Sequence, residues 1–400
     1  MKKFTIIYEE LDHMKLGKPQ MMYPTYMNYF GWNCEAITYN LKNDLPEEAR
    51  GVKIIKLKQI FSFLPNTNLF KFMKRIPMYY YIYKNAKKID VMMLYHLTKC
   101  SYWNTFFYKL ANPNGKVFIK GDFDFPEFQE EVEWLTKTPK NMREFFKKRR
   151  WKKEFNKRLK LVEMMDIFSV EPTDSYEGLL KHGYAGLDVS KKLLHIPNGF
   201  DKKLVDELNI ERNTFDKKEN VIFTACRLGT PEKNTEFFLE VMKKVNLKNW
   251  KVYLAGPIVP EFQKTIDKFY KEYPKLKESV KFLGYISDKT VLYSYHNKAK
   301  VFMMTSRGES FANVFLEAMY FGEHIVVTRV SGAEDLTNHQ ISGKIIEQKD
   351  LDRYSSYIQD IIDGKIDLED RYKKTIKHSE NFLWEKSVKK LDKRLELLLK

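Results

Sequence analysis

Cysteine and long apolar runs are the features that this sequence has least of. Only Cys34, Cys100 and Cys226 occur in 400 residues, far apart and odd in number. This usage is typical of reduced thiols in a cytosol, not of a disulfide framework or a structural zinc site. The first apolar stretch ends at Tyr8, before Glu9, and no later one approaches the length of a membrane span. We therefore expect a cytoplasmic protein without a signal peptide or a spanning helix.

Acidic residues are also in deficit. Lysine and arginine number 70 against 53 acidic residues, which gives a formal net charge of +17. Residues 137–160 hold twelve of the basic residues and only two glutamates, so more than half of the excess lies in one segment. Such a charge favours an anionic partner, which can be nucleic acid, anionic lipid or a phosphate-bearing substrate.

Short apolar runs alternate with helical stretches along the whole chain. Strands are expected first at residues 4–8, 34–39, 52–57, 91–94, 117–119 and 167–170. After Pro197-Asn198-Gly199 a second series is expected at 221–225, 251–255, 280–283, 301–304 and 325–328. The alternation predicts an α/β fold with two doubly wound, Rossmann-like domains, residues 1–199 and 200–380, facing across a cleft. Ligands of such sheets bind beyond the carboxyl ends of the strands.

One motif places two carboxylates eight residues apart, where a strand leads through a loop into a helix. It runs Glu309-Ser-Phe-Ala-Asn-Val-Phe-Leu-Glu317. The first turn of the helix offers unpaired N–H groups and the positive end of a dipole, which suit a pyrophosphate. A carboxylate accepts two hydrogen bonds from a diol. Together these groups suit a nucleotide sugar, although two glutamates at this spacing also occur by chance in charged helices.

Further segments surround this motif in a fixed order. They are His195-Ile-Pro-Asn-Gly-Phe-Asp201, Arg227-Leu with Lys233-Asn234, Tyr253-Leu-Ala-Gly-Pro257, Val280-Lys-Phe-Leu-Gly-Tyr285, Phe302-Met-Met-Thr-Ser306 and Val330-Ser-Gly332. With them the sequence resembles, over about residues 195–346, the retaining GT-B glycosyltransferases of family 4, which carry a Glu-x7-Glu element. The resemblance also implies that a last helix, about residues 381–400 and opening at Trp384-Glu385, returns to the N-terminal domain.

The resemblance implies roles for single residues. Arg227 and Lys233 would bind the donor pyrophosphate, Glu317 the ribose hydroxyls and Glu309, as a catalytic residue, the transferred sugar. The nucleotide base would meet the loop at Tyr285 and Ile286. The phosphate would meet the backbone of the motif's loop, which is Ser310, Phe311, Ala312 and Asn313. Ser310 and Ala312 replace glycines common in the family.

In the N-terminal half the resemblance is thinner. It implies that His96, after the run Asp90-Val-Met-Met-Leu-Tyr, is catalytic and reaches the donor sugar, and that Gly17 lets the first loop approach the donor. Glu9 and its neighbours either meet the acceptor or form a solvated loop. Asp122-Phe-Asp124 spells the Asp-x-Asp of metal-dependent GT-A enzymes, but we interpret it as coincidence, because it lies in the acceptor half.

The resemblance therefore implies retaining, metal-independent transfer of a hexose from a nucleotide sugar, with a UDP-sugar favoured, to an acceptor hydroxyl. No cofactor is expected, and the acceptor would be a sugar or a lipid-linked glycan of bacterial surface polysaccharide synthesis. A basic nucleic-acid-binding protein is one alternative, but no nucleic-acid-binding motif accompanies the charge. A catalytically silent GT-B subunit is the other, and the intact Arg227, Lys233, Glu309 and Glu317 argue against it.

The basic segment has a second property. Trp151, Phe155, Leu159 and Val162 recur at helical spacing among its lysines and arginines. This pattern predicts a basic amphipathic helix, which suits peripheral binding to the anionic inner face of a plasma membrane. Alternatively, the apolar stripe packs on the N-terminal domain and the basic side chains are solvated.

Overall fold

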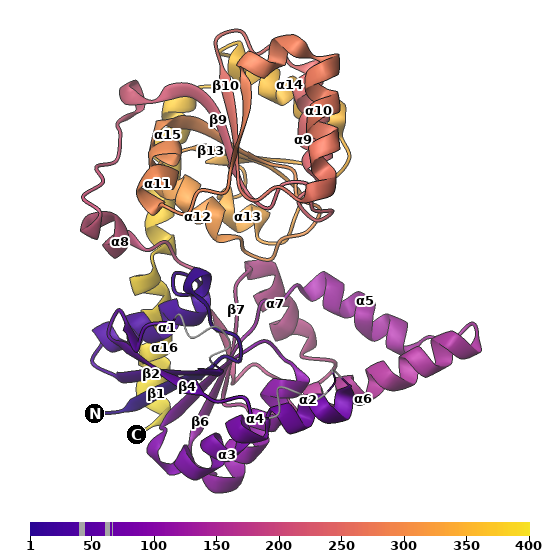
Figure 1. The fold of residues 1–400 in the computed structure, drawn as a ribbon, viewed down its shortest axis with the longest axis vertical. Coiled ribbons are helices and arrows are strands. Elements are labelled where there is room, and N and C mark those ends of the chain that lie inside the picture. Colours follow the sequence, from indigo (N-terminus) through magenta and orange to yellow (C-terminus); the bar gives the residue numbers. More distant parts are fainter. Residues whose placement is uncertain (40–44, 61–64, 66) are drawn as a thin grey trace. The chain divides into compact units, whose positions relative to one another are not determined.

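The computed structural model describes residues 1–39, 45–60, 65 and 67–400. The chain forms two compact units (Figure 1). The first consists of Met1–Pro197 together with Trp384–Lys400, and the second is Asn198–Leu383. No helix in the described ranges combines the length and the apolar character that crossing a bilayer requires.

The first unit is built on an 8-stranded sheet in the order β3-β4-β2-β1-β5-β6-β7-β8. All neighbours pair in parallel except β3 and β4. The strands are β1 (Lys3–Ile7), β2 (Asn33–Tyr39), β3 (Glu48–Ala49), β4 (Val52–Leu57), β5 (Val91–Tyr95), β6 (Lys116–Lys120), β7 (Ile167–Val170) and β8 (Leu193–His195). Its helices are α1 (Pro19–Tyr29), α2 (Asn68–Lys74), α3 (Ile76–Asn85), α4 (Lys99–Ala111), α5 (Phe125–Thr136), α6 (Met142–Met164), α7 (Thr173–His182) and α16 (Trp384–Leu398).

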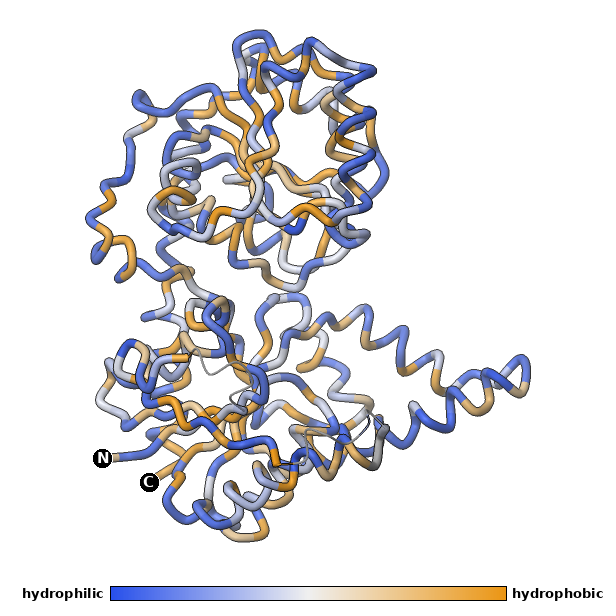
Figure 2. The backbone as a smooth tube through the Cα atoms, in the orientation of Figure 1, coloured by the Kyte–Doolittle hydropathy of each residue, from blue (hydrophilic) through white to orange (hydrophobic). Residues whose placement is uncertain are grey.

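Helices cover both faces of this sheet because its strands are apolar on both sides. In β5, Met92 and Leu94 belong to one apolar cluster, and Val91 and Met93 to another, as the alternation of side chains along a strand requires. The first cluster is closed by α3 to α7 and the second by α1 and α16. Figure 2 shows hydrophobic stretches in the strands.

The second unit repeats the plan on a 6-stranded, all-parallel sheet in the order β11-β10-β9-β12-β13-β14. Its strands are β9 (Glu219–Ala225), β10 (Lys251–Ala255), β11 (Val280–Gly284), β12 (Ala299–Met304), β13 (His324–Thr328) and β14 (Gly343–Ile346). Its helices are α8 (Lys202–Glu207), α9 (Thr235–Lys244), α10 (Gln263–Glu272), α11 (Lys289–Lys298), α12 (Asn313–Tyr320), α13 (Ala333–Leu336), α14 (Leu351–Ile362) and α15 (Leu368–Ser379). Residues of α9, α10 and α14 cover one face, and those of α11, α12 and α13 the other.

Both sheets have the doubly wound topology that the sequence predicts, and the α/β fold class is confirmed. In each, the strand order reverses beside the first strand, between β1 and β5 in one unit and between β9 and β12 in the other. Loops that leave the carboxyl ends of these strands diverge to opposite faces, which opens a crevice for ligands. The fold therefore directs attention to the loops after β1, β5, β9 and β12.

The membrane interpretation required the apolar stripe of the basic segment to be a free surface. In the structure most of the stripe is covered. In α6, Phe155 and Val162 are buried in the core of the first unit, and Leu159 packs against it. Trp151 alone of the four stays exposed, at 44%. The stripe packs inward because the sheet face beneath it is apolar and burial of such side chains is favourable.

Candidate functional site

The loops after β9 and β12 are tied together at the switch point of the second sheet. The backbone N–H of Arg307 donates to the carbonyl oxygen of Glu232 at 2.8 Å, and the Arg307 guanidinium donates to Asn234 Oδ1 at 2.9 Å. Thr305 Oγ1 donates to the carbonyl oxygen of Asn234 at 3.1 Å. These bonds hold the segment that carries Arg227 and Lys233 against the segment that carries Glu309.

Lys233 and Glu309 form an ion pair at this junction. Their side chains are only 15% and 10% exposed, so the pair is partly withdrawn from water. Ser306 Oγ also donates to Glu309 Oε1, at 2.8 Å. Arg227 behaves differently, because its side chain is 65% exposed and pairs with Glu232 at 2.6 Å. The junction therefore holds one sheltered cation and one exposed cation.

The N-terminus of α12 opens beside these charges. Its N-cap residue is Ala312, and no side chain of the described residues caps the helix. The first-turn N–H groups are thus left for an anion. Before it, Phe311 is buried, and its carbonyl oxygen accepts a hydrogen bond from Asn198 Nδ2 at 3.1 Å, which anchors the loop. Asn313 Oδ1 is buried and has no hydrogen-bond partner among the described residues.

A Cβ at one glycine would disturb this loop. Gly332 has φ +72°, and a Cβ there would lie 2.7 Å from the carbonyl oxygen of Ser310. That distance is shorter than a van der Waals contact, so the loop after β13 approaches Ser310 only because residue 332 has no side chain.

Glu317 is the fifth of the eight residues of α12, and its carboxylate lies between Lys289 and His296. Lys289 Nζ, at the start of α11, is 2.6 Å from its Oε1, and His296 Nε2 is 3.6 Å from its Oε2. Burial by itself raises the pKa of this carboxyl, but Lys289 and His296 lower it to about 2. Glu317 is therefore an anion at neutral pH, and it can only accept hydrogen bonds.

His296 is a part of this site that the sequence motifs did not indicate. It is fully buried, and its Nδ1 lies 2.5 Å from Glu323 Oε1. Burial lowers the pKa of the imidazole, but Glu323 and Glu317 outweigh burial and raise it above the ordinary value. No local sequence pattern indicates this histidine, because it belongs to the site only through its proximity to Glu317, which lies on another helix.

Tyr285 and Ile286 follow β11 at the same edge of the sheet. Tyr285 is 58% exposed, whereas Ile286 packs partly against the apolar cluster beneath α11 and α12. Gly284, immediately before them, has φ +69°, a left-handed conformation that favours glycine. The turn thus presents an exposed aromatic ring beyond β11.

The first unit carries the remaining two predicted residues. His96 follows β5 with φ +62°, which is uncommon for a residue other than glycine, and its N–H donates to the carbonyl oxygen of Lys120 at 2.8 Å. Burial lowers the pKa of its imidazole, and nearby Asp122 opposes that shift. At Gly17 a Cβ would meet no atom of the described chain within 4 Å.

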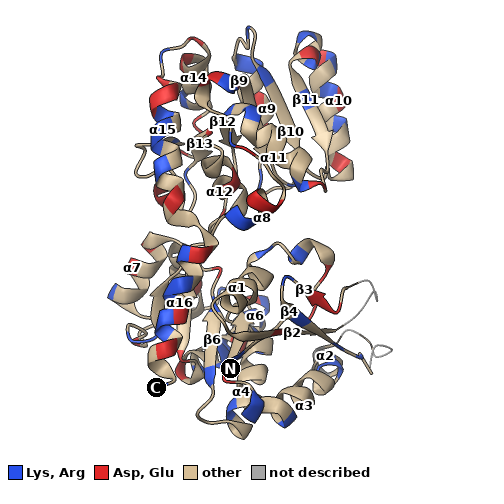
Figure 3. Cartoon of the chain, turned by 90° about the vertical axis from the view of Figure 1, so that its left-hand side faces the viewer, with Lys and Arg blue, Asp and Glu red and all other residues tan. Residues whose placement is uncertain are grey.

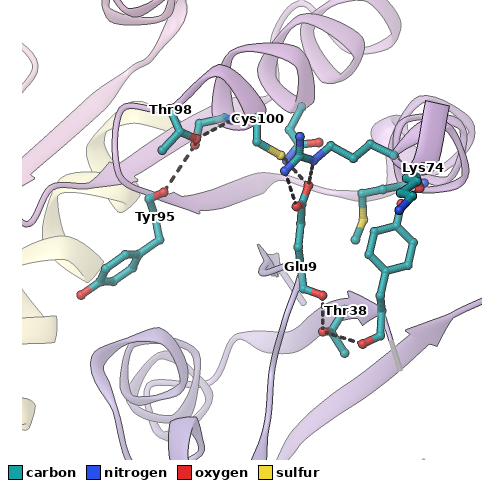
Figure 4. Close-up of polar contacts among 11 residues, drawn as sticks. Glu9, Thr38, Lys74, Tyr95, Thr98 and Cys100 are labelled. Carbon is teal, nitrogen blue, oxygen red and sulfur yellow. Dashed lines mark hydrogen bonds and ion pairs between the residues drawn. The ribbon is translucent and has the colours of Figure 1, made fainter. Parts of the chain in front are cut away.

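Glu9 is held firmly at the carboxyl end of β1 (Figure 4). Its carboxylate accepts hydrogen bonds from Arg75 Nε at 2.6 Å, from Arg75 Nη2 at 2.8 Å and from the Cys100 thiol at 2.6 Å. Burial and the adjacent Glu9 raise the pKa of Cys100, so the thiol stays protonated and donates. One of the two alternatives predicted that Glu9 belongs to a solvated loop. These hydrogen bonds show that this alternative is wrong for Glu9.

Asp122 and Asp124 have separate environments. Asp124 is the N-cap of α5 and accepts a hydrogen bond from the backbone N–H of Glu127 at 2.9 Å. Asp122 influences His96 instead. Within the described ranges, no three His, Cys, Asp or Glu side chains gather as a metal-ligand group.

Known proteins resemble this chain in sequence and fold. Residues 205–379 match the family described as Glycosyl transferases group 1. Over 182 residues the chain is 25% identical to the UDP-Gal:alpha-D-GlcNAc-diphosphoundecaprenol alpha-1,3-galactosyltransferase of Escherichia coli. The match covers 44% of this chain and 46% of that relative, so it spans about half the length of either protein.

Two solved structures have the same fold. Sucrose-phosphate synthase from Thermosynechococcus elongatus superposes with a TM-score of 0.71 at 16% identity, covering 100% of this chain and 99% of that one. HepE from Anabaena, solved in complex with UDP, superposes with a TM-score of 0.69 at 14% identity, covering 99% of this chain and 100% of that one. The superpositions show that the chain shares the fold of these structures, and the match to the group 1 family lies within its second unit.

Proposed function

We propose that this protein is a retaining glycosyltransferase that moves a hexose from a UDP-sugar to an acceptor hydroxyl without a metal ion. The observation that carries the proposal is the junction of the loops after β9 and β12. There, two cations, two carboxylates and an uncapped helix N-terminus meet at the switch point of a doubly wound sheet. A nucleoside diphosphate sugar has groups that match each of them.

The diphosphate would bind Arg227, Lys233 and the first-turn N–H groups of α12. Cations and oriented N–H groups offset the charge that develops on a departing phosphate, and they do so best when water is excluded. Lys233 is already sheltered beside this helix. When Lys233 turns to the phosphate, it leaves Glu309, whose carboxylate then accepts hydrogen bonds from hydroxyls of the transferred sugar.

The nucleoside would be recognised by Glu317 and the turn after β11. An ionised carboxylate that is already positioned by Lys289 suits the ribose diol. The exposed ring of Tyr285 and the side chain of Ile286 would contact the base. HepE, of the same fold, has been solved with UDP, and the name of the Escherichia coli relative specifies UDP-Gal, which supports uridine as the nucleoside.

Retention follows from the groups available in this proposal. The acceptor attacks the anomeric carbon from the face that the diphosphate leaves, and the departing phosphate oxygen takes the acceptor proton. The new glycosidic bond forms as the bond to phosphate breaks. Because its pKa is lowered, His96 is neutral at neutral pH, and we assign it a hydrogen bond to the transferred sugar. No step of this scheme uses an enzymic nucleophile.

The acceptor is proposed to be a lipid-linked glycan in the synthesis of a bacterial surface polysaccharide. The support is the name of the Escherichia coli relative, which specifies a diphosphoundecaprenol-linked sugar. Glu9, fixed by Arg75 at the carboxyl end of β1, is a preorganised carboxylate that could accept a hydrogen bond from an acceptor hydroxyl.

Calorimetry and donor hydrolysis test the proposal. With a panel of nucleotide sugars, wild type should bind UDP and slowly hydrolyse a UDP-sugar, and chelators should leave the rate unchanged. Glu317→Ala should bind UDP about 10- to 100-fold more weakly, because hydrogen bonds to charged groups contribute about 1.5–3 kcal/mol each. Glu347→Ala, which removes an exposed carboxylate paired with Arg329, is the control.

Two results would remove the proposal. One is unchanged UDP affinity in folded Glu317→Ala, and the other is rapid release of the sugar with inverted anomeric configuration, seen by NMR. Activity that disappears with chelators and returns with a divalent cation would refute the metal-independent part alone, and Asp122 would then be examined as a ligand.

A further inference from the structure

Helices α5 and α6 form a hairpin whose end extends away from the sheet of the first unit (Figure 1). The part of α6 before Phe155 is roughly 20 Å long at 1.5 Å per residue. In that part Lys148 is buried, and the other side chains are half-buried or exposed. The basic segment 137–160 thus lies mostly on this hairpin, and its first half stands clear of the core.

The base of the hairpin is fixed to the first unit. Arg158 forms an ion pair with Glu131 of α5, and Lys99 of α4 lies 3.6 Å from Glu154. Nearer the end, Lys148 Nζ donates to the carbonyl oxygen of Lys137 at 2.6 Å, and Trp134 meets Trp151 edge to face. These contacts join α5 to α6 along their length, and they hold the end of the hairpin in a fixed position relative to its base.

Three large apolar side chains are exposed at this end. Met142, Phe145 and Phe146, in the first turns of α6, are 66%, 44% and 58% exposed. They follow the short connection from α5, far from the apolar cluster that Phe155 enters. Exposed aromatic residues at the tip of a projecting element remain in water only at a cost in free energy, since their burial is favourable.

Cations surround these apolar residues. Around the α6 helix, Met142, Phe146, Arg149, Arg150 and Lys153 share the face opposite Lys148 and Phe155, because they recur at intervals of three and four residues. Arg149, Arg150, Lys152 and Lys153 are exposed, and none forms an ion pair with a carboxylate of the described residues. By contrast, acidic and basic residues alternate along α16 (Figure 3).

We propose that the α5–α6 hairpin docks the first unit on an anionic lipid bilayer, with Phe145 and Phe146 entering the interface and the cations of α6 binding lipid headgroups. Aromatic and methionine side chains partition into the boundary between headgroups and acyl chains, and nearby lysines and arginines add attraction to anionic lipids. A free polyanion would use the cations but would leave the exposed rings in water. The combination of both kinds of side chain therefore favours a lipid surface.

Sedimentation of the full chain with vesicles tests this proposal without reference to transferase activity. Wild type should bind vesicles of phosphatidylcholine mixed with phosphatidylglycerol, and bind pure phosphatidylcholine at least tenfold more weakly. Salt at about 1 M, where the screening length is about 3 Å, should release it. Arg149→Glu, Arg150→Glu, Lys152→Glu and Lys153→Glu together should reduce binding at least tenfold.

Matched variants separate the site from net charge. Lys264→Glu, Lys271→Glu, Lys275→Glu and Lys277→Glu change four exposed lysines of the second unit and should leave vesicle binding within about twofold of wild type. Phe145→Ser with Phe146→Ser keeps the charge and should weaken binding about tenfold, since burial of each ring contributes to partitioning. Circular dichroism confirms that each variant is folded.

Three results would overturn the proposal. If wild type does not bind anionic vesicles at low salt, a lipid bilayer is excluded as the partner of the hairpin. Equal vesicle binding by wild type and the double serine variant would show that the cations act alone and that the two rings do not enter the interface. A concentration-dependent dimer that the serine variant abolishes, without vesicle binding, would assign the tip to self-association. UDP binding is independent of all three outcomes, so this proposal can fail while the proposed function stands.

Discussion

At the scale of residues, the candidate site depends on side chains that neutralise one another. Glu309 pairs with Lys233, and Glu317 pairs with Lys289 and lies near His296. A buried carboxylate without partners would be protonated, because desolvation disfavours its charged form. Lys289 and His296 therefore keep Glu317 ionised, and the ion pair with Lys233 holds Glu309 in position, before any ligand is present.

We predict that His296→Gln weakens UDP binding by about three- to tenfold. Glutamine retains a hydrogen-bonding group but cannot take up the proton that Glu323 and Glu317 favour on His296, so the Glu317 carboxylate is less well positioned. Calorimetry measures the effect, and His339→Gln, at a histidine with a 76% exposed side chain, is the control.

A double-mutant cycle checks that His296 acts through Glu317. In the Glu317→Ala background the His296→Gln substitution should have little further effect on UDP affinity, because the two residues form one network. Additive losses would contradict this, and they would assign to His296 a general role in folding.

At the scale of elements, buried polar side chains connect strands to helices. His324 begins β13, and its imidazole lies 2.9 Å from Tyr357 Oη on α14 and 3.2 Å from the carbonyl oxygen of Ser342 before β14. One ring nitrogen must donate to the carbonyl, and the other can accept from the phenol, so the neutral tautomer fits both partners. Burial and the nearby Arg371 lower the pKa of His324 to about 4.

This histidine should make the second unit sensitive to acid. Its pKa is about 6.5 when unfolded and about 4 when folded, so the unfolded chain binds the proton more readily between these values. Its contribution is therefore present above pH 6.5 and is lost as the pH falls toward 4. Between pH 7.5 and 4.5 the loss should be about 2–3 kcal/mol.

Urea unfolding of the second unit at the two pH values measures this prediction. His324→Gln does not titrate and should lose about 2–3 kcal/mol less stability than wild type on acidification. His339→Gln, which changes an exposed histidine, should follow the wild-type curve. If wild type and His324→Gln lose equal stability, the imidazole is already protonated in the native protein.

At the scale of the whole molecule, the chain ends by returning to the unit in which it began. The last helix, α16, packs against α1, and its apolar face enters the core of the first unit through Trp384, Val388, Leu391 and Leu395. Trp32 Nε1 also donates to the buried carboxylate of Asp392 at 2.8 Å. The first unit is therefore incomplete until the second has been synthesised.

We predict that Leu391→Ala destabilises the first unit by about 2–5 kcal/mol, the usual cost of truncating a fully buried leucine. Hydrogen exchange should increase in peptides of α1 and β1, while UDP affinity, which we assign to the second unit, should change less than twofold. Leu397→Ala, at a leucine on the same helix that is 64% exposed, should have almost no effect. Equal protection in both variants would show that α16 contributes little to this core.

Much of the architecture could be predicted because parallel strands buried on both faces read as short apolar runs. The strands that contain Ile6, Met93, Phe223 and Phe302 were all located in this way. Three short strands were missed. None of them has more than two apolar residues besides alanine and glycine in succession: β3 is Glu48-Ala49, β8 is Leu193-Leu-His195 and β14 is Gly343-Lys-Ile-Ile346, so no apolar run stands out from the adjacent loops.

The sequence by itself determined the α/β class and the succession of strands and helices, because these depend on local periodicity and on which side chains avoid water. It also contained the Glu-x7-Glu motif, whose two glutamates lie on one loop and the helix that follows. Only the tertiary structure decided that His296 stands behind Glu317, that Arg75 fixes Glu9, and that Phe155 faces the core while Phe146 faces solvent. Those contacts join residues far apart in the chain, and packing of the completed sheets selects them.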